Sequence, residues 1–210
     1  MIIKVCGMRE AENIRAVEYT GIQWMGFIFY PPSPRYVSER PDYMPESVQR
    51  IGVFVNDSVE NIIRTVLDFG LHAVQLHGKE SPEFCKELLD AFHVAGKEIM
   101  LIKAFSIGEK RELEQTVPYE PYCRYFLFDT PCLGYGGSGQ SFNWNILSAY
   151  KGHTPFLLSG GLSYKHLSAL KEFTHPQWAG IDLNSGFEKR PAYKDALLLQ
   201  TFIQEFNKEQ

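Results

Sequence analysis

The chain has 210 residues, of which 44% are hydrophobic and 22% are charged, with a formal net charge of −4 at pH 7. This length is enough for one sizeable hydrophobic core. The negative balance offers no broad basic field, so we expect no nucleic-acid partner. No apolar run approaches membrane-spanning length and the N-terminus lacks a secretory pattern, so we expect no membrane partner and a cytoplasmic protein.

Four cysteines, at positions 6, 85, 123 and 132, form no Cys-x-x-Cys pair and no zinc-site spacing. We expect them to be reduced. His72 and His77 are five residues apart in one predicted strand and therefore face opposite sides. The remaining histidines show no metal-binding spacing, so we predict no metal site.

The first half of the chain alternates short apolar segments with amphipathic ones. Gly21 and Gly70 are typical helix stops, and Ser81-Pro82 is typical of a helix start. Three prolines between residues 31 and 34 predict a stiff loop. We predict strands at 2–6, 23–30, 50–55 and 72–77, and helices at 10–20, near 44–49, at 59–69 and from 81 onward.

The same alternation continues to the C-terminus. We predict strands at 98–104, 124–128, 156–158 and 180–183, helices at 106–116, 143–150 and 193–206, and a glycine-rich loop beside the site at 133–140. Strands that are apolar along most of their length suit a parallel sheet covered on both faces. Eight βα units favour a closed (β/α)8 barrel over an open doubly wound sheet. With no linker or second domain evident, we predict an α/β fold with one barrel domain over residues 1–210.

Two glycine-bearing turns follow the last two predicted strands. One contains Gly160 and Gly161, and the other is Asn184-Ser185-Gly186. Glycine allows close backbone approach to a ligand, and a helix start offers unpaired N–H donors. In a (β/α)8 barrel, the loops after strands seven and eight commonly bind phosphate. The two turns therefore predict a phosphate site made of backbone amides.

A barrel of this kind carries its active site at the C-terminal ends of its strands. Cys6 ends the first strand and Asp129 the sixth, so a thiol base and a carboxylic acid could face each other. Lys4, on the same face as Cys6, would favour the thiolate if it points inward. Equally, Cys6 could be a small core residue and Asp129 a turn cap.

Two further charged residues lie at strand ends. Arg35, in the proline-rich loop after the second strand, could bind a carboxylate with its planar guanidinium. An arginine on a loop is usually only solvated, so this residue alone carries little weight. Asp182 could bind a substrate hydroxyl or amine, or could brace the adjacent turn, which we slightly prefer.

Taken together, the motifs resemble the phosphoribosylanthranilate isomerase family of tryptophan biosynthesis. They occur in order over nearly the whole chain. Each motif alone is weak, but seven in register are specific. The matching segments are KVCG at 4–7, GFIFYPPSPRYV at 26–37, GVFVN at 52–56, VQLHG at 74–78, FDT at 128–130 with GGSG at 136–139, LSGGL at 158–162 and DLNSGFE at 182–188.

The resemblance implies an Amadori rearrangement of N-(5-phosphoribosyl)anthranilate, a small phosphorylated substrate, without a metal or organic cofactor. It implies that Asp129 is the general acid, that Cys6 is the general base, and that Arg35 holds the anthranilate carboxylate. It places the phosphate on backbone N–H groups near Gly160, Gly161, Asn184, Ser185 and Gly186.

Two departures from the family pattern are Ala192, where glycine is usual, and Asn184, where serine is common. The first could shift the last helix and the second could alter the phosphate turn. Alternatives are another phosphate-binding barrel enzyme, such as indole-3-glycerol-phosphate synthase, or a non-catalytic barrel that binds phosphosugars. The synthase should need a catalytic lysine and a longer N-terminal extension. The sequence leaves a monomer and a homodimer open.

Overall fold

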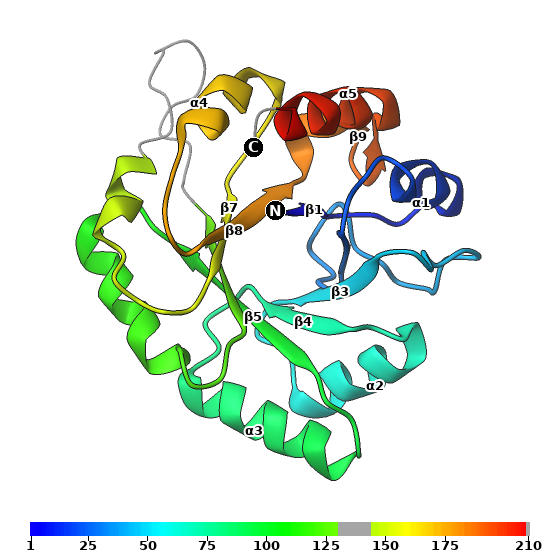
Figure 1. The fold of residues 1–210 in the computed structure, drawn as a ribbon. Helices are drawn as coiled ribbons and strands as arrows, with labels where there is room; N and C mark the ends of the chain where they lie inside the picture. The colour runs from blue at the N-terminus through cyan, green and yellow to red at the C-terminus, as the bar shows by residue number, and fades with distance from the viewer. Residues whose placement is uncertain (130–143, 209–210) are drawn as a thin grey trace.

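The computed structural model describes residues 1–129 and 144–208 and shows a closed barrel of parallel strands with helices around it (Figure 1). The strands follow one another around the ring in chain order, and the first pairs with the eighth, with Val5 opposite Leu183. The predicted (β/α)8 fold is confirmed. The strands are β1 (Ile2–Val5), β2 (Trp24–Ile28), β3 (Gln49–Phe54), β4 (Ala73–Leu76), β5 (Met100–Ser106), β6 (Tyr125–Asp129), β7 (Phe156–Ser159) and β8 (Trp178–Leu183).

The helices start and stop where local chemistry favours it. Ser58 and Ser81 cap two of them by accepting hydrogen bonds from backbone N–H groups, and Gly70 ends one in the left-handed conformation. Within 1–129 and 144–208, no helix combines the length and apolarity needed to span a bilayer. The α-helices are α1 (Ala11–Glu18), α2 (Val59–Phe69), α3 (Pro82–Val94), α4 (Leu167–Glu172) and α5 (Ala196–Asn207), and the 3-10 helices are η1 (Lys110–Tyr119), η2 (Trp144–Ala149), η3 (Tyr164–His166) and η4 (Ser185–Phe187).

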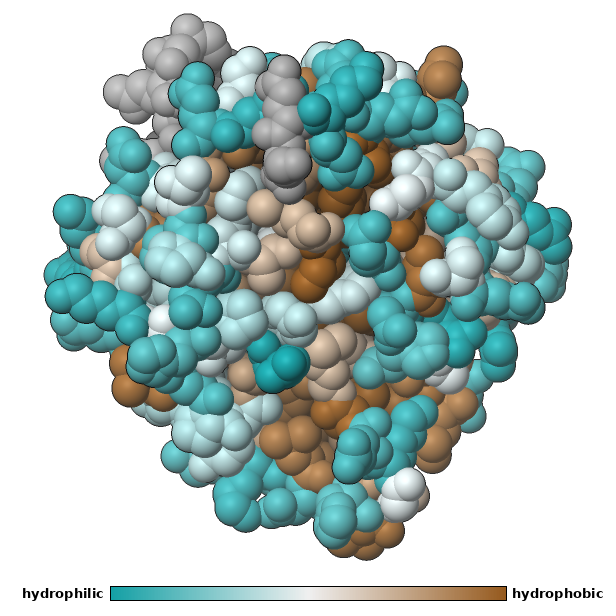
Figure 2. All heavy atoms as spheres, viewed as in Figure 1, coloured by the Kyte–Doolittle hydropathy of each residue, from teal (hydrophilic) through white to brown (hydrophobic). Residues whose placement is uncertain are grey.

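The core has two layers. The larger layer fills the space between strands and helices, and the smaller one fills the barrel with side chains such as Ile51, Ile102 and Leu127. Hydrophilic residues cover most of the face seen in Figure 2, while hydrophobic residues show mainly in patches toward its middle. Because side chains alternate along a strand, the interior positions continue from Leu127 to Asp129 at the C-terminal ends of the strands.

The predicted helix near 44–49 is wrong, because this segment is irregular and β3 begins at Gln49. The backbone N–H groups of this segment donate to the buried carboxylate of Glu18 instead of to helical carbonyls. It accepts hydrogen bonds from the backbone N–H of Glu46 at 2.7 Å and of Ser47 at 2.6 Å. A tertiary contact from α1 therefore sets the local structure.

Two other predicted helices differ in extent or type. The helix predicted at 106–116 is the 3-10 helix η1, because β5 continues to Ser106 and a Glu109–Glu112 capping box starts the helix later. The closing helix starts at Ala196 rather than at 193, capped by Asp195. Between β8 and α5 lies a small hairpin that the sequence did not predict, formed by β9 (Glu188–Arg190) and β10 (Tyr193–Lys194).

Candidate active site

Cys6 lies directly after β1, at the C-terminal end of the strand. Its N–H donates to the carbonyl of Leu183 at 2.8 Å, and the residue is 4% exposed. A Cβ atom on Gly26 of β2 would lie only 2.7 Å from the Cys6 sulfur. The thiol therefore occupies space that the neighbouring strand leaves open by carrying glycine.

Two residues before Cys6, Lys4 points into the barrel and is fully buried. Its Nζ pairs with Asp182 Oδ1 at 2.9 Å, across the β1–β8 seam where the two residues are register partners. Asp182 was predicted either to bind substrate or to brace the adjacent turn. In the structure it holds a protein group, Lys4, rather than the turn. A role of Asp182 in substrate binding stays a prediction.

Burial raises the pKa of the Cys6 thiol, and the positive charges of Lys4 and Lys194 oppose this effect without overcoming it. Lys4, which points inward to Asp182, favours the thiolate as its position suggested. Desolvation is nevertheless the larger influence. The raised pKa favours the protonated thiol at neutral pH.

Asp129 is the last residue of β6 and pairs with Ser106 of β5 on one side and Ser159 of β7 on the other. Burial raises the pKa of its carboxyl, the charge of Asp182 adds to the rise, and His77 opposes it. Asp182 also influences Cys6. Because β1 and β6 belong to one closed barrel of parallel strands, the thiol after β1 and the carboxyl at the end of β6 lie at the same mouth of the barrel, and the raised pKa of Asp129 suits a general acid.

His77 extends the interior face of β4 into this mouth. Its Nδ1 lies 3.0 Å from Nε2 of the buried Gln75. The ring is open to solvent at the mouth yet surrounded by protein on most sides, and this desolvation lowers its pKa. His77 is therefore neutral at pH 7. Its place at a strand end was visible in the sequence, but no motif gave it a role.

Arg35 lies beside this mouth with its guanidinium already engaged. Nε donates to Glu188 Oε1 at 2.8 Å and Nη2 to Glu188 Oε2 at 2.6 Å. These hydrogen bonds raise the pKa of Arg35 further. The fork expected for a substrate carboxylate is bound to a protein carboxylate on its Nε edge, so a substrate would use the Nη1 end.

The two predicted glycine turns meet. Gly160 and Gly161 have φ of 106° and 64°, which side chains disfavour. A Cβ on Gly186 would collide with the Leu162 carbonyl, so the turn after β8 packs directly against the turn after β7. Directly after β8, however, the chain forms only the short η4 (Ser185–Phe187), and the next α-helix, α5, begins at Ala196.

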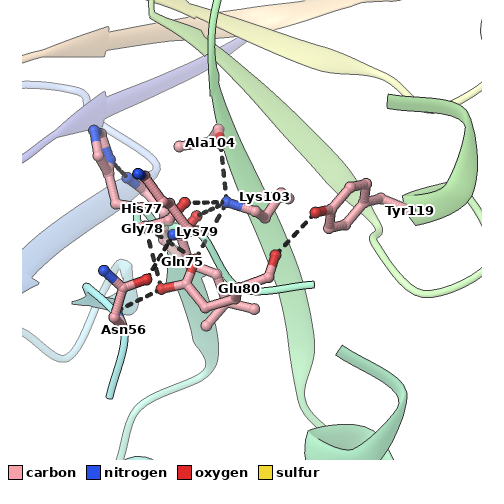
Figure 3. Close-up of polar contacts among 10 residues, drawn as sticks. Asn56, Gln75, His77, Gly78, Lys79, Glu80, Lys103, Ala104 and Tyr119 are labelled. Carbon is pink, nitrogen blue, oxygen red and sulfur yellow. Dashed lines mark hydrogen bonds and ion pairs between the residues drawn. The ribbon is translucent and has the colours of Figure 1, made fainter. Parts of the chain in front are cut away.

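A second buried ion pair lies outside the barrel interior, between the middle of β5 and the loop after β4 (Figure 3). Lys103 Nζ lies 3.2 Å from Glu80 Oε2 and 2.9 Å from the Gly78 carbonyl. Glu80 in turn accepts from the backbone N–H of Asn56 at 2.7 Å. The pair ties two loops together. A lysine inside the apolar segment 101–105 was the sequence signal for it.

A cavity of about 390 Å³ lies between the loop after β2 and α2, with Phe29, Tyr36 and Arg64 in its lining. Cys6 and Asp129 do not line it, so it is separate from the candidate site. Among residues 1–129 and 144–208, no three His, Cys, Asp or Glu side chains gather as metal ligands. The predicted loop at 133–140 lies outside the described residues, as does Asn143 of the helix predicted at 143–150.

The family model described as N-(5'phosphoribosyl)anthranilate (PRA) isomerase matches residues 3–205. An N-(5'-phosphoribosyl)anthranilate isomerase of Phocaeicola vulgatus is 59% identical, covering 100% of this chain and 99% of the relative. One from Thermotoga neapolitana is 38% identical, covering 96% of each.

Solved structures of the same family superimpose on this chain. Phosphoribosyl anthranilate isomerase from Thermotoga maritima superimposes with a TM-score of 0.79 at 31% identity, covering 98% of each chain. A crystal structure of phosphoribosyl anthranilate isomerase in complex with reduced 1-(o-carboxyphenylamino)-1-deoxyribulose 5-phosphate gives a TM-score of 0.77 at 29% identity, also covering 98% of each chain. With the matched residues spanning nearly its whole length, the chain belongs to the N-(5'-phosphoribosyl)anthranilate isomerase family.

Proposed function

We propose that the chain catalyses the Amadori rearrangement of N-(5-phosphoribosyl)anthranilate to 1-(2-carboxyphenylamino)-1-deoxyribulose 5-phosphate, with Asp129 as general acid and Cys6 as general base. The observation that carries the assignment of roles is the shared barrel mouth. A buried thiol and a carboxyl of raised pKa both lie there, under the influence of Asp182. Family membership supports the reaction itself.

The reaction begins at the furanose ring. Asp129 donates a proton to the ring oxygen, the bond from that oxygen to C1 breaks, and the anilino nitrogen lone pair forms a C1=N iminium. Cys6 thiolate then removes the proton from C2. The C2–H electrons form a C1=C2 enolamine and neutralise the nitrogen. Loss of the C2 hydroxyl proton and protonation at C1 give the ketone. Each acid–base contribution is typically worth roughly 10²–10⁴-fold.

The substrate's two anionic ends need separate sites. We assign the anthranilate carboxylate to Arg35. We assign the phosphate to backbone N–H groups of the two turns, near Gly160, Gly161, Asn184, Ser185 and Gly186. The left-handed glycines and the packing of one turn against the other support this assignment. A mechanism that needs a reduced Cys6 also supports a cytoplasmic location.

The test is direct. Purified protein is mixed with freshly prepared phosphoribosylanthranilate, and the decay of substrate fluorescence is followed. Decay that scales with enzyme concentration is expected, and binding without turnover would favour a non-catalytic phosphosugar-binding barrel. A Thermotoga maritima relative at 29% identity is described as dimeric. Light scattering will decide between a monomer and a homodimer for this chain.

A further inference from the structure

A buried carboxylate, Glu188, joins two cations beside the thiol. Its Oε1 accepts from Arg35 Nε at 2.8 Å and from Lys194 Nζ at 2.6 Å, and its Oε2 accepts from Arg35 Nη2 at 2.6 Å. The Glu188 side chain is 5% exposed and that of Lys194 is fully buried. A carboxylate between two such donors is held in one orientation.

The unit formed by Glu188, Arg35 and Lys194 packs against Gly7, the residue that follows Cys6. A Cβ on Gly7 would lie 2.5 Å from Arg35 Cδ and 2.9 Å from Asn184 Oδ1. The same Asn184 oxygen accepts from Lys194 Nζ at 2.7 Å. The chain can pack Arg35 and Asn184 this tightly because Gly7 has no side chain.

The hairpin that carries Glu188 and Lys194 is itself unusual. Ala192, between β9 and β10, is fully buried with φ of 64°, and its N–H donates to Glu188 Oε1 at 3.1 Å. Backbone strain of this kind persists only where surrounding contacts hold it. Here those contacts include the carboxylate at the centre of the unit.

We infer that Glu188 is a positioning residue for the isomerisation, fixing Arg35 so that its Nη1 end is presented to the anthranilate carboxylate of the substrate. Among residues 1–129 and 144–208, no acceptor lies on Arg35 Nη1. Glu188 is ionised, because hydrogen bonds from Arg35 and Lys194 outweigh the effect of burial and lower its pKa. The inference rests on the proposed function.

A second effect of Glu188 on binding has the opposite sign. Its negative charge beside Arg35 repels an incoming carboxylate. Its removal would then tighten binding. If Glu188 positions Arg35, its removal weakens binding of the carboxylate; if it competes, its removal tightens binding. The change in affinity on Glu188→Gln therefore separates the two effects.

The experiment measures Kd by calorimetry for two ligands. One is reduced 1-(o-carboxyphenylamino)-1-deoxyribulose 5-phosphate, and the other is the same compound without the ring carboxylate. Glu188→Gln is expected to weaken the first about tenfold and the second less than about twofold, because only the first uses Arg35. Equal weakening of both, no change, or tighter binding of the first would overturn the inference.

Two further variants guard the result. Glu188→Asp keeps the charge near Lys194 but shortens its reach to Arg35, so it should show the same selective loss even if Glu188→Gln does not fold. Glu80→Gln is the matched control, since Glu80 also holds a buried lysine, Lys103 of β5 (Figure 3). It should leave the ratio of the two affinities unchanged.

The wild-type assay separates the two levels of failure. A wild-type protein that neither turns over phosphoribosylanthranilate nor prefers the carboxylated ligand would remove the proposed function. If the wild type turns over the substrate and prefers the carboxylated ligand, and both Glu188→Gln and Glu188→Asp keep that preference, only the positioning role of Glu188 is wrong.

Discussion

At the scale of single residues, the pKa values of the two proposed catalytic groups are shifted in the same direction. Burial raises the pKa of Cys6 and that of Asp129. A raised pKa helps an acid, but it makes a thiol a less available base. In the proposed mechanism, the form that reacts carries a protonated Asp129 and a Cys6 thiolate, and the raised thiol pKa makes this a minor form of the free protein at neutral pH.

The first prediction concerns the thiol. Thiolate absorbance of wild-type protein minus that of Cys6→Ser isolates Cys6 from the other three cysteines. We expect this difference to titrate above the ordinary thiol pKa of about 8.5, since desolvation outweighs the charges of Lys4 and Lys194. A midpoint below about 8 would show that the cations dominate.

The second prediction concerns stability. The folded pKa of Asp129 is raised, so its stabilising contribution is complete below the unfolded pKa and is lost as pH rises through the folded value. Ionising the half-buried Asp129 costs more in the folded protein than in the unfolded chain, and Asp129→Asn lacks this cost. Urea unfolding should find Asp129→Asn more stable than wild type at pH 7, with the gap closing near pH 4. An equal difference in unfolding free energy between the two proteins at pH 7 and pH 4 would contradict this prediction.

At the scale of elements, the hairpin β9–β10 places a non-glycine residue in the left-handed region. The left-handed conformation costs an L-residue roughly 1–2 kcal/mol. Replacing a buried alanine by glycine ordinarily costs about 1–2 kcal/mol, from a lost methyl and a freer unfolded chain. At Ala192 these two effects offset each other.

The third prediction uses that balance. Ala192→Gly should change the free energy of unfolding by less than about 0.5 kcal/mol. Ala73→Gly, at an equally buried position in β4, should destabilise the protein by about 1–2 kcal/mol. Equal losses in the two variants would show that the Ala192 conformation is not strained.

Elements were predictable from the sequence where the signal is local. Gly70 and Ser81 mark helix ends by their own chemistry, and the structure follows them. The segment near 44–49 was mispredicted because Glu18, far away in sequence, takes its backbone N–H groups. The β9–β10 hairpin was missed because buried contacts of Glu188 and Lys194 with Arg35 and Asn13 hold it, and periodicity does not show them.

Some features of the candidate site were likewise predictable from the sequence and others were not. The strand-end rule predicted where Cys6 and Asp129 would lie, because the alternation of βα units fixes which ends meet. It did not reveal that Asp182 would hold Lys4, or that Glu188 would hold Arg35. Those pairings depend on side-chain geometry across the ring.

At the scale of the whole molecule, closure of the ring brings the first strand beside the eighth and all strand ends to one mouth. Residues 123 positions apart, Cys6 and Asp129 (129 − 6), thereby come to share the environment of Asp182. The buried ion pairs Lys4–Asp182, inside the barrel, and Lys103–Glu80, outside it, connect neighbouring strands and loops on different sides of the ring. The architecture thus brings the proposed acid and the proposed base to one end of the barrel.

The decisive measurement is the steady-state rate of fluorescence decay of phosphoribosylanthranilate with wild type, Cys6→Ser and Asp129→Asn under identical conditions. We predict turnover by wild type and a loss of about 10²–10⁴-fold in each variant, with both variants retaining cooperative unfolding. Turnover within about tenfold of wild type in either folded variant would contradict the assignment of a thiol base and a carboxylic acid across the barrel mouth.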